Sequence, residues 1–259
     1  MAAGRSQAIC GSRQASSPHW KLVHRLEITS FMLQAHRMTV VLACAHRDFA
    51  FLAADSVRWD LVQRRNLGPV EKIHLAGDHG AVAIGGTNVD RTALGQELVA
   101  ARASGEGFPA AARRIAPRLF AEKRALMAKH GQTAQSAMCW YAEVSADGCS
   151  IHRHHFPEDQ LFLLDGIDCM GPDTAALARD CLTAASRLRR GGTIALDAWA
   201  WETIGMAAAA FPNFVGRPVM AVMLRADGTR HVRDVDDPSQ WVGSAAFEVP
   251  VEALSPRWR

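Results

Sequence analysis

Short apolar runs bounded by turn residues dominate the chain beyond residue 38, a pattern typical of buried β-strands. The apolar runs 39–45 and 49–54 flank a His-Arg-Asp turn, and the predicted strands 70–75 and 81–84 flank a Gly-Asp-His-Gly turn. Glycine in such turns supplies the positive φ angles that tight connections need. This part of the chain is therefore predicted to form two antiparallel hairpins.

Longer stretches with helical spacing separate the strand blocks. We predict a helix at 90–103 that Thr87 or Asn88 caps, and a second helix at 110–129 that bends near Pro117 because proline removes an internal hydrogen bond. The remaining predicted elements are strands at 137–145, 150–156 and 161–168, helices at 173–188 and 195–210, and strands at 218–224 and 229–235. Blocks of short strands separated by paired helices favour antiparallel sheets with helices packed outside. We therefore predict an α+β fold, a four-layer αββα sandwich of two antiparallel sheets between helix layers.

The first 38 residues differ in character from the rest. Residues 1–37 carry five basic residues and one acidic residue, a net charge of +4, so the remainder of this chain of net charge +3 is nearly neutral at −1. We interpret 1–38 as an N-terminal extension, a propeptide or a misassigned start, although the Arg- and Ser-rich composition also fits an organellar transit peptide. Residues 39–259 are expected to form one domain.

Composition excludes several classes of function. A nearly neutral body offers no electrostatic case for nucleic-acid binding. No apolar run approaches the roughly 18 residues of a membrane helix, and the N-terminus lacks an apolar secretory signal, so we predict a cytoplasmic protein without membrane partners. The six cysteines form no CxxC pair, which gives no indication of a disulfide framework or a zinc site.

Four short motifs in the predicted hairpins carry candidate chemistry. Thr39 opens the first strand, Ala-Ala-Asp-Ser at 53–56 closes the second, Val-Glu-Lys-Ile at 70–73 opens the third, and Ala-Ile-Gly-Gly-Thr at 83–87 closes the fourth. Together they resemble the front half of a proteasome β-type subunit, and among such subunits the chain is similar to the bacterial proteasome homologues. Each motif alone is weak, whereas four in register are specific.

The resemblance implies a distinct role for each of four residues. Thr39 matches the N-terminal threonine nucleophile, Asp55 its acidic partner, Lys72 the lysine beneath the threonine, and Gly86 the glycine whose backbone N–H forms the oxyanion hole. The spacing to Lys72 is one residue longer than is common in the family, which places an insertion within 58–69. The resemblance thus implies a threonine endopeptidase, an N-terminal-nucleophile (Ntn) hydrolase.

The chemistry of these residues supports that assignment. A hydroxyl needs a base, and a terminal α-amine, whose pKa is ordinarily about 7.7–8.0, can act as one at neutral pH. A cationic Lys72 would keep that amine neutral, and Asp55 would orient Lys72. Thr39 must therefore become the N-terminus, either by initiation at Met38 and removal of that methionine, which we favour, or by autolytic cleavage of a propeptide.

The resemblance also implies a substrate pocket and an assembly. Its specificity positions fall on Val70, His74, Ile84 and Asn88, from which we expect an apolar pocket of moderate size with a pH-sensitive histidine. Implied partners are peptide or unfolded protein substrates, further copies of the chain in homo-oligomeric stacked rings, and an ATP-dependent unfoldase, since the chain has no phosphate loop of its own. No cofactor and no metal are expected.

The back half departs from the family pattern. Asp-Cys-Met-Gly at 168–171 and Pro-Asn-Phe-Val-Gly at 212–216 stand where the family has accessory serines, so activity is expected to be slow or confined to few substrates, with Asn213 as a substitute polar support. The main alternative function is a non-catalytic structural ring subunit that retains its N-terminal segment.

Simpler interpretations exist for single motifs. Thr39 alone is an ordinary strand residue, and Asp55 with Lys72 alone is a surface ion pair. His152 and His154, on one strand face, are interpreted as solvated rather than as metal ligands, because no second cluster completes a site. We interpret the remaining hairpin histidines as structural.

Overall fold

A computed structural model describes residues 39–60, 65–86, 91–129, 131, 137–235 and 243–254. The predicted extension 1–38 and Asn88 lie outside these residues. The described chain is a mixed α+β protein with antiparallel sheets and four α-helices.

The helices are α2 (Arg91–Ala103), α3 (Phe108–Lys129), α4 (Thr174–Leu188) and α5 (Leu196–Ala210), with short 3-10 turns η3 (Ala245–Phe247) and η4 (Val251–Leu254). The strands are β1 (Val41–His46), β2 (Phe49–Asp55), β3 (Val57–Asp60), β4 (Arg65–Pro69), β5 (Ile73–Leu75), β6 (Gly80–Gly86), β7 (Ala137–Ser145), β8 (Gly148–Phe156), β9 (Gln160–Leu163), β10 (Gly166–Met170), β11 (Thr193–Ala195), β12 (Val219–Arg225), β13 (Arg230–Val235) and β14 (Glu248–Pro250).

Two five-stranded antiparallel sheets form the body of the described chain. The first has the order β10-β1-β2-β12-β13, so two strands from the later half of the chain flank the β1–β2 hairpin. The second has the order β5-β6-β7-β8-β9 and follows the sequence without a crossover. Both predicted hairpins are confirmed, with Val41 opposite Ala54 in the first and Ile73 opposite Ala83 in the second.

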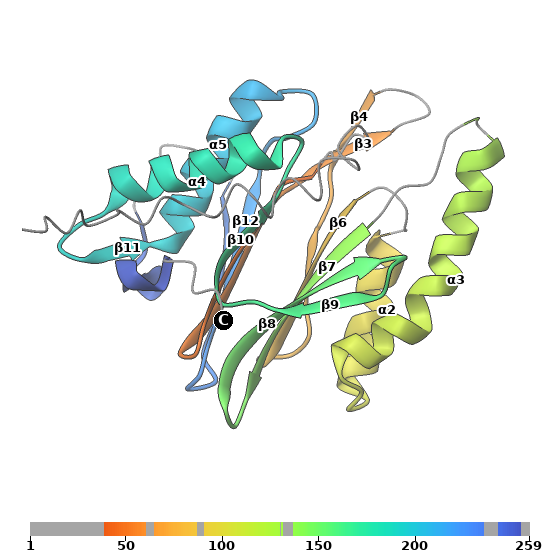
Figure 1. Cartoon of the computed structure of the whole chain (residues 1–259), viewed down its shortest axis with the longest axis horizontal. Coiled ribbons are helices and arrows are strands. Elements are labelled where there is room, and N and C mark those ends of the chain that lie inside the picture. Colours follow the sequence, from red (N-terminus) through yellow and green to blue (C-terminus); the bar gives the residue numbers. More distant parts are fainter. Residues whose placement is uncertain are drawn as a thin grey trace, which may run out of the picture. The chain divides into compact units, whose positions relative to one another are not determined.

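Packing divides the core into three clusters that follow from the twofold alternation of side chains along a strand. Leu42 of β1 faces α4 and α5 in one cluster, whereas its neighbours Val41 and Ala43 face the second sheet in another. The third cluster joins the opposite face of the second sheet, including Ile84, to α2 and α3. Figure 1 shows α4 and α5 beside the first sheet and α2 and α3 beside the second.

One predicted strand is wrong. The run 161–168 is not a single element, because it divides into β9, which ends the second sheet, and β10, which ends the first. Gly166 has φ +85°, a conformation that glycine adopts without a steric penalty, and the chain crosses from one sheet to the other just before it. The continuous apolar pattern concealed this crossover.

Two small sheets were also missed. The hairpin β3–β4 follows the first predicted hairpin directly, and its second strand is largely exposed and contains both glycine and proline, so it lacks the apolar alternation of a core strand. Strands β11 and β14 have three residues each, too few to show a period. The helix α3 continues through Pro117 as one element.

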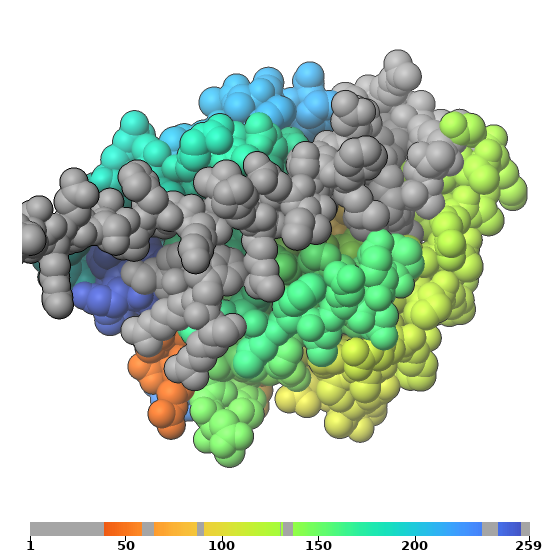
Figure 2. All heavy atoms as spheres, in the orientation of Figure 1, coloured from red at the N-terminus to blue at the C-terminus, as the bar shows by residue number. Residues whose placement is uncertain are grey.

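The strand β1 is buried along most of its length, whereas Arg47 and Asp48 in the turn after it are exposed. Atoms from the orange part of the chain are visible at the lower left of the face that Figure 2 shows. None of the helices that the structure describes is long and apolar enough to cross a membrane.

Candidate active site

Thr39 and Asp55 meet at the end of the β1–β2 hairpin. Both residues have an exposed fraction of 1%. The Asp55 carboxylate accepts the backbone N–H of Val40 at 2.8 Å through Oδ1 and that of Val57 at 3.1 Å through Oδ2, while the Asp55 N–H donates to the Val40 carbonyl at 3.3 Å. The carboxylate therefore fixes the backbone immediately after Thr39.

Lys72 completes a buried ion pair with Asp55. Its Nζ donates to Asp55 Oδ1 at 2.7 Å, and the exposed fractions of the two side chains are 1% and 0%. Lys72 lies just before β5, where its carbonyl accepts the N–H of Ile84 at 3.0 Å, so the neighbouring strand β6 holds its backbone. The alternative of a surface ion pair is wrong for these residues, because the surrounding strands exclude water from both charges.

The environment of Lys72 changes the pKa of its ammonium group. Burial lowers the pKa of Lys72 to about 8, with the Asp55 charge opposing the shift and the Arg91 charge adding to it. At pH 7 the ammonium is still the main form. The neutral amine is nevertheless populated at a lower pH than in an ordinary lysine, whose pKa is about 10.4.

Arg91 is a residue of this cluster that sequence reasoning missed. It is the first residue of α2, and its Nη1 donates to Thr39 Oγ1 at 2.5 Å. The contact joins residues 52 positions apart. No sequence motif marks Arg91, because an arginine at a helix start is common and its proximity to Thr39 arises only when α2 packs on the second sheet.

Gly86 ends β6, the strand whose Ile84 binds the Lys72 backbone. Its φ of +105° favours glycine, and its register partner is Ala137 on β7. Gly85 beside it allows close packing, since an added Cβ would lie 1.9 Å from Cε of Met170 on β10. Gly86 as an oxyanion donor stays a prediction.

The four predicted pocket residues have different environments. Val70 is half-buried, while Ile84 is completely buried against the α2 and α3 cluster. His74 is buried, and an added Cβ on Gly95 of α2 would lie 2.1 Å from its ring, so α2 packs directly on the imidazole. Burial lowers the pKa of His74 below its ordinary value, opposed by Glu71. Asn88 lies outside the described residues.

The segments that replace the accessory serines also lie near the hairpin end. An added Cβ on Gly171 would be 3.6 Å from Val40, and one on Gly216 would be 2.7 Å from Val57. Asp168 is directed elsewhere: Trp140 Nε1 and Arg153 Nη1 each donate to its carboxylate at 2.7 Å, which links the two sheets. Asn213 is exposed, and its proposed support of Thr39 stays untested.

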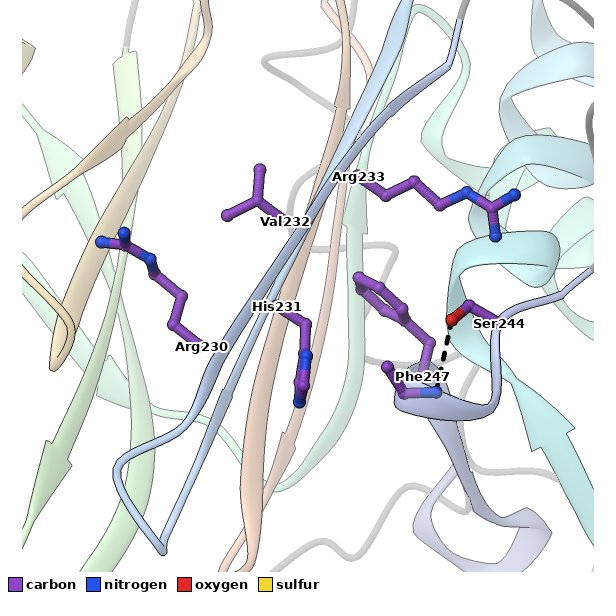
Figure 3. A pocket seen from close by; sticks show the side chains of 7 residues that line it. Arg230, His231, Val232, Arg233, Ser244 and Phe247 are labelled. Carbon is purple, nitrogen blue, oxygen red and sulfur yellow. Dashed lines mark hydrogen bonds between the residues drawn. The ribbon is translucent and has the colours of Figure 1, made fainter.

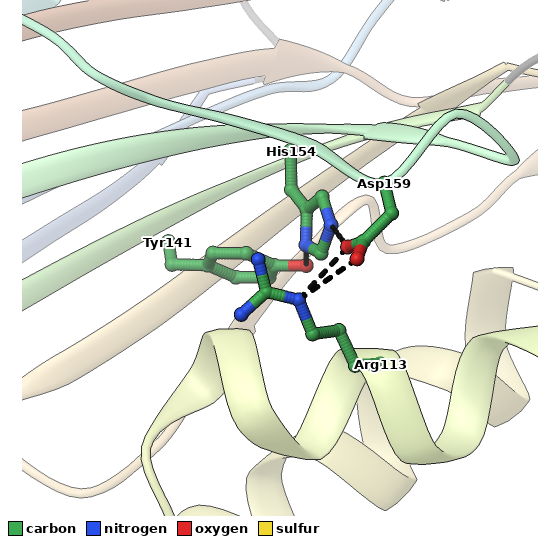
Figure 4. A network of polar contacts seen from close by, with 4 residues as sticks. All are labelled: Arg113, Tyr141, His154 and Asp159. Carbon is green, nitrogen blue, oxygen red and sulfur yellow. Dashed lines mark hydrogen bonds and ion pairs between the residues drawn. The ribbon is translucent and has the colours of Figure 1, made fainter.

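A separate polar network corrects the interpretation of His154. This histidine is completely buried rather than solvated, with Nδ1 3.2 Å from Tyr141 Oη and Nε2 2.6 Å from Asp159 Oδ1, and Arg113 Nε donates to both Asp159 oxygens at 2.9 and 3.1 Å (Figure 4). The partners of His154 come from β7 and from the turn after β8, and α3 supplies the arginine that binds Asp159, none of which the strand pattern shows. Across the described part of the chain, no group of three or more His, Cys, Asp or Glu side chains is placed to hold a metal ion.

A surface pocket of about 550 Å³ lies beside β13 and η3 and shares no residue with the Thr39 cluster. Figure 3 shows Arg230 and Val232 pointing to one side of β13 and His231 and Arg233 to the other. Arg233 binds Asp197 at 2.5 Å, and Arg230 lies 3.4 Å from Asp78. These basic groups are thus already engaged in structural contacts.

Comparison with known protein families finds none that matches this chain, and comparison with curated proteins finds no matching sequence.

Proposed function

We propose that the chain, once Thr39 is its N-terminus, is a threonine endopeptidase subunit of the proteasome β type. The observation that carries this proposal is the buried Lys72–Asp55 pair, in which Asp55 also holds the backbone N–H of the residue after Thr39. Burying two charges is costly, and a structural role does not require it at the start of a strand. A lysine beside the proposed nucleophile can instead keep the neighbouring α-amine neutral, as the reaction requires.

The proposed reaction follows from these groups. The free α-amine of Thr39 takes the hydroxyl proton while Oγ attacks the substrate carbonyl carbon, and the carbonyl oxygen becomes an oxyanion that the Gly86 N–H stabilises. The resulting ammonium returns its proton to the leaving nitrogen as the C–N bond breaks, which leaves an ester on Thr39. Water, deprotonated by the same amine, then hydrolyses the ester and restores the hydroxyl.

Two cations near Thr39 suit this base. A positive charge disfavours protonation of a neighbouring amine, so Lys72 and Arg91 should both lower the pKa of the Thr39 α-amine from its ordinary value of about 7.7–8.0. The amine would then be neutral at pH 7. The Asp55 carboxylate binds Lys72 and offsets part of its positive charge, which limits how far Lys72 lowers the pKa of the amine.

The remaining assignments belong to the same proposal. The three core clusters support a four-layer αββα sandwich of the Ntn-hydrolase kind. From the resemblance we propose homo-oligomeric stacked rings, a cytoplasmic location, peptide or unfolded protein substrates, and an ATP-dependent unfoldase as partner. Val70, His74, Ile84 and Asn88 are the proposed pocket positions.

The test uses the full chain as expressed, with its N-terminus read by intact mass. We expect a species that begins at Thr39 and hydrolyses fluorogenic peptides, and we expect Thr39→Ala to reduce kcat/KM by more than about 10³-fold, because no other group replaces the nucleophile. Thr39→Ser is the matched control, since it keeps the hydroxyl and should retain part of the activity.

Two results would contradict the proposal. Residues 1–38 still present in the assembled protein would favour the structural ring subunit, because an amide nitrogen at Thr39 is not a base. Hydrolysis that persists in Thr39→Ala, with circular dichroism unchanged, would place the chemistry elsewhere.

A further inference from the structure

The contact between Arg91 and Thr39 places a hydrogen-bond donor on the atom proposed as the nucleophile. Arg91 Nη1 donates to Thr39 Oγ1 at 2.5 Å, whereas the Lys72 ammonium donates to Asp55 at 2.7 Å. Arg91 is half-buried at the first position of α2 and takes part in a further interaction of the structure, so its position does not depend on Thr39 alone. The guanidinium is therefore held beside Oγ1.

The direction of this hydrogen bond limits what Arg91 can do. A guanidinium has only donors and keeps its protons in proteins. Oγ1 must therefore accept through a lone pair, and its own proton points to another group. Arg91 can neither take the hydroxyl proton nor supply one, but it can stabilise negative charge on the oxygen, because a hydrogen bond to an ionised group is stronger than a neutral one.

Negative charge develops on Oγ at two points of the proposed reaction, first when the hydroxyl attacks the substrate and again when the ester on Thr39 is hydrolysed. In the hydrolysis, water adds to the ester carbon and gives a proton to the α-amine. The C–Oγ bond then breaks, its electron pair moves onto Oγ, and the α-ammonium returns the proton to that oxygen. Arg91 keeps its own protons throughout.

The hydrogen bond contributes unequally at these two points. Before attack the hydroxyl already accepts from Arg91, so the interaction is present in the starting state and only its gain in strength lowers the barrier. An ester oxygen is a weaker acceptor than a hydroxyl, because the carbonyl withdraws its lone-pair density. The bond is therefore regained only as Oγ departs, where it lowers the barrier by more.

We propose that Arg91 is a catalytic residue that stabilises Thr39 Oγ as the leaving group when the ester intermediate is hydrolysed. This inference rests on the proposed function and adds to it a role that is specific to one step. A merely structural link between α2 and the start of β1 would differ in its consequence. Its loss would lower stability without slowing ester hydrolysis relative to acylation.

The test follows the ester on Thr39 in the full chain as expressed, with 4-nitrophenyl acetate, whose small acyl group requires little of the substrate pocket. Release of nitrophenolate measures acylation, and intact mass after an acid quench measures the acetylated protein. The ester on Thr39 is the part that hydroxylamine removes and that Thr39→Ala lacks. Arg91→Met, which keeps an unbranched side chain without donors, should slow hydrolysis of this ester by about 10–100-fold, the effect of losing a hydrogen bond to a charged group, and should slow acylation less.

Matched variants control for charge and for position on the helix. Arg91→Lys keeps a cationic donor and should hydrolyse the ester faster than Arg91→Met. Arg102→Met, in the last turn of the same helix, removes an arginine that lies 3.4 Å from Glu143 and should leave both rates unchanged. Circular dichroism checks that Arg91→Met is folded, and Arg91→Gln, which is polar but uncharged, tests the same expectation if it is not.

The outcomes separate this inference from the proposed function. Ester hydrolysis that is equally fast with and without the guanidinium, or acylation slowed as much as hydrolysis, would overturn the role of Arg91 and leave Thr39 as the nucleophile. If no hydroxylamine-sensitive ester forms on Thr39 of the unaltered chain, the proposed function itself is overturned.

Discussion

Two cation–carboxylate pairs of similar length lie in contrasting parts of the molecule. The Lys72–Asp55 pair is 2.7 Å long with side-chain exposed fractions of 1% and 0%, and the Arg113–Asp159 pair is 2.9 Å long with exposed fractions of 49% and 51%. The first lies beneath the start of β1, and the second lies between α3 and the turn after β8. Distance alone would rank them as equivalent.

Burial makes them different in energy and in use. Solvent screens Arg113 and Asp159, so their attraction is weak, and the nearby completely buried groups are neutral ones, His154 and Tyr141. Water does not screen Lys72 and Asp55, so each charge depends on the other for its stability in the interior. Removal of one partner should therefore destabilise the folded chain more for the buried pair than for the exposed pair. The free energy of unfolding measures this difference.

The largest effect is expected for Lys72→Ala. Removal of the ammonium leaves the Asp55 carboxylate buried without its counter-ion, which should lower the free energy of unfolding by about 3–5 kcal/mol. In the proposed mechanism the α-amine of Thr39 would also lose a cation that keeps it neutral, so peptide hydrolysis should fall as well. Urea unfolding followed by circular dichroism measures the first effect, and a peptidase assay measures the second.

Two controls define what this result means. Arg118→Ala breaks an exposed network with Glu97 and Glu122 and should leave both stability and hydrolysis nearly unchanged. The double variant Asp55→Ala with Lys72→Ala should be less destabilised than the two single changes predict together, because no unpaired charge remains. Strict additivity would argue against a coupled buried pair.

A smaller effect is expected for Tyr141→Phe in the network of Figure 4. The change removes the hydroxyl that lies 3.2 Å from His154 Nδ1 and leaves that buried nitrogen without this partner, so the loss of unfolding free energy should be about 1–2 kcal/mol. Hydrolysis should be unaffected, because the network lies outside the Thr39 cluster. A loss as large as that of Lys72→Ala would show that burial of charge does not distinguish the two regions.

The smallest effect concerns the pH dependence of stability. Burial lowers the pKa of His154, and also that of His74, below the ordinary histidine value of 6.5. On acidification the unfolded chain therefore binds these protons first, so the stability that the neutral rings provide is complete above pH 6.5 and is lost as the pH falls below it. Lys72, with a pKa of about 8, is protonated in both states there and should not contribute.

Thermal melts between about pH 7 and about pH 5 test this expectation, since the range spans the ordinary pKa of histidine. The melting temperature of the unaltered chain should fall on the acidic side of this range, and the fall should be shallower in His154→Leu. The same slope in both proteins would mean that His154 does not titrate differently in the folded and unfolded chains.

Much of the architecture could be predicted from the sequence. Local patterns of apolar and polar residues show where a strand or helix can bury one face, so the two hairpins, the four helices and the strand ends that carry Thr39, Asp55 and Lys72 could all be located in advance. Elements without such a pattern, such as β3–β4, could not. The crossover before Gly166 was also concealed, because β9 and β10 are similarly apolar although they belong to different sheets.

The sequence by itself determined the types and the spacing of the candidate groups, because both are properties of neighbouring residues. Only the tertiary structure decided that Asp55 and Lys72 are buried, that His154 is enclosed rather than solvated, and that Arg91 reaches Thr39. Burial and long-range contact depend on how separate elements pack. Arg91, 52 positions from Thr39, reaches it only through the docking of α2 on the second sheet.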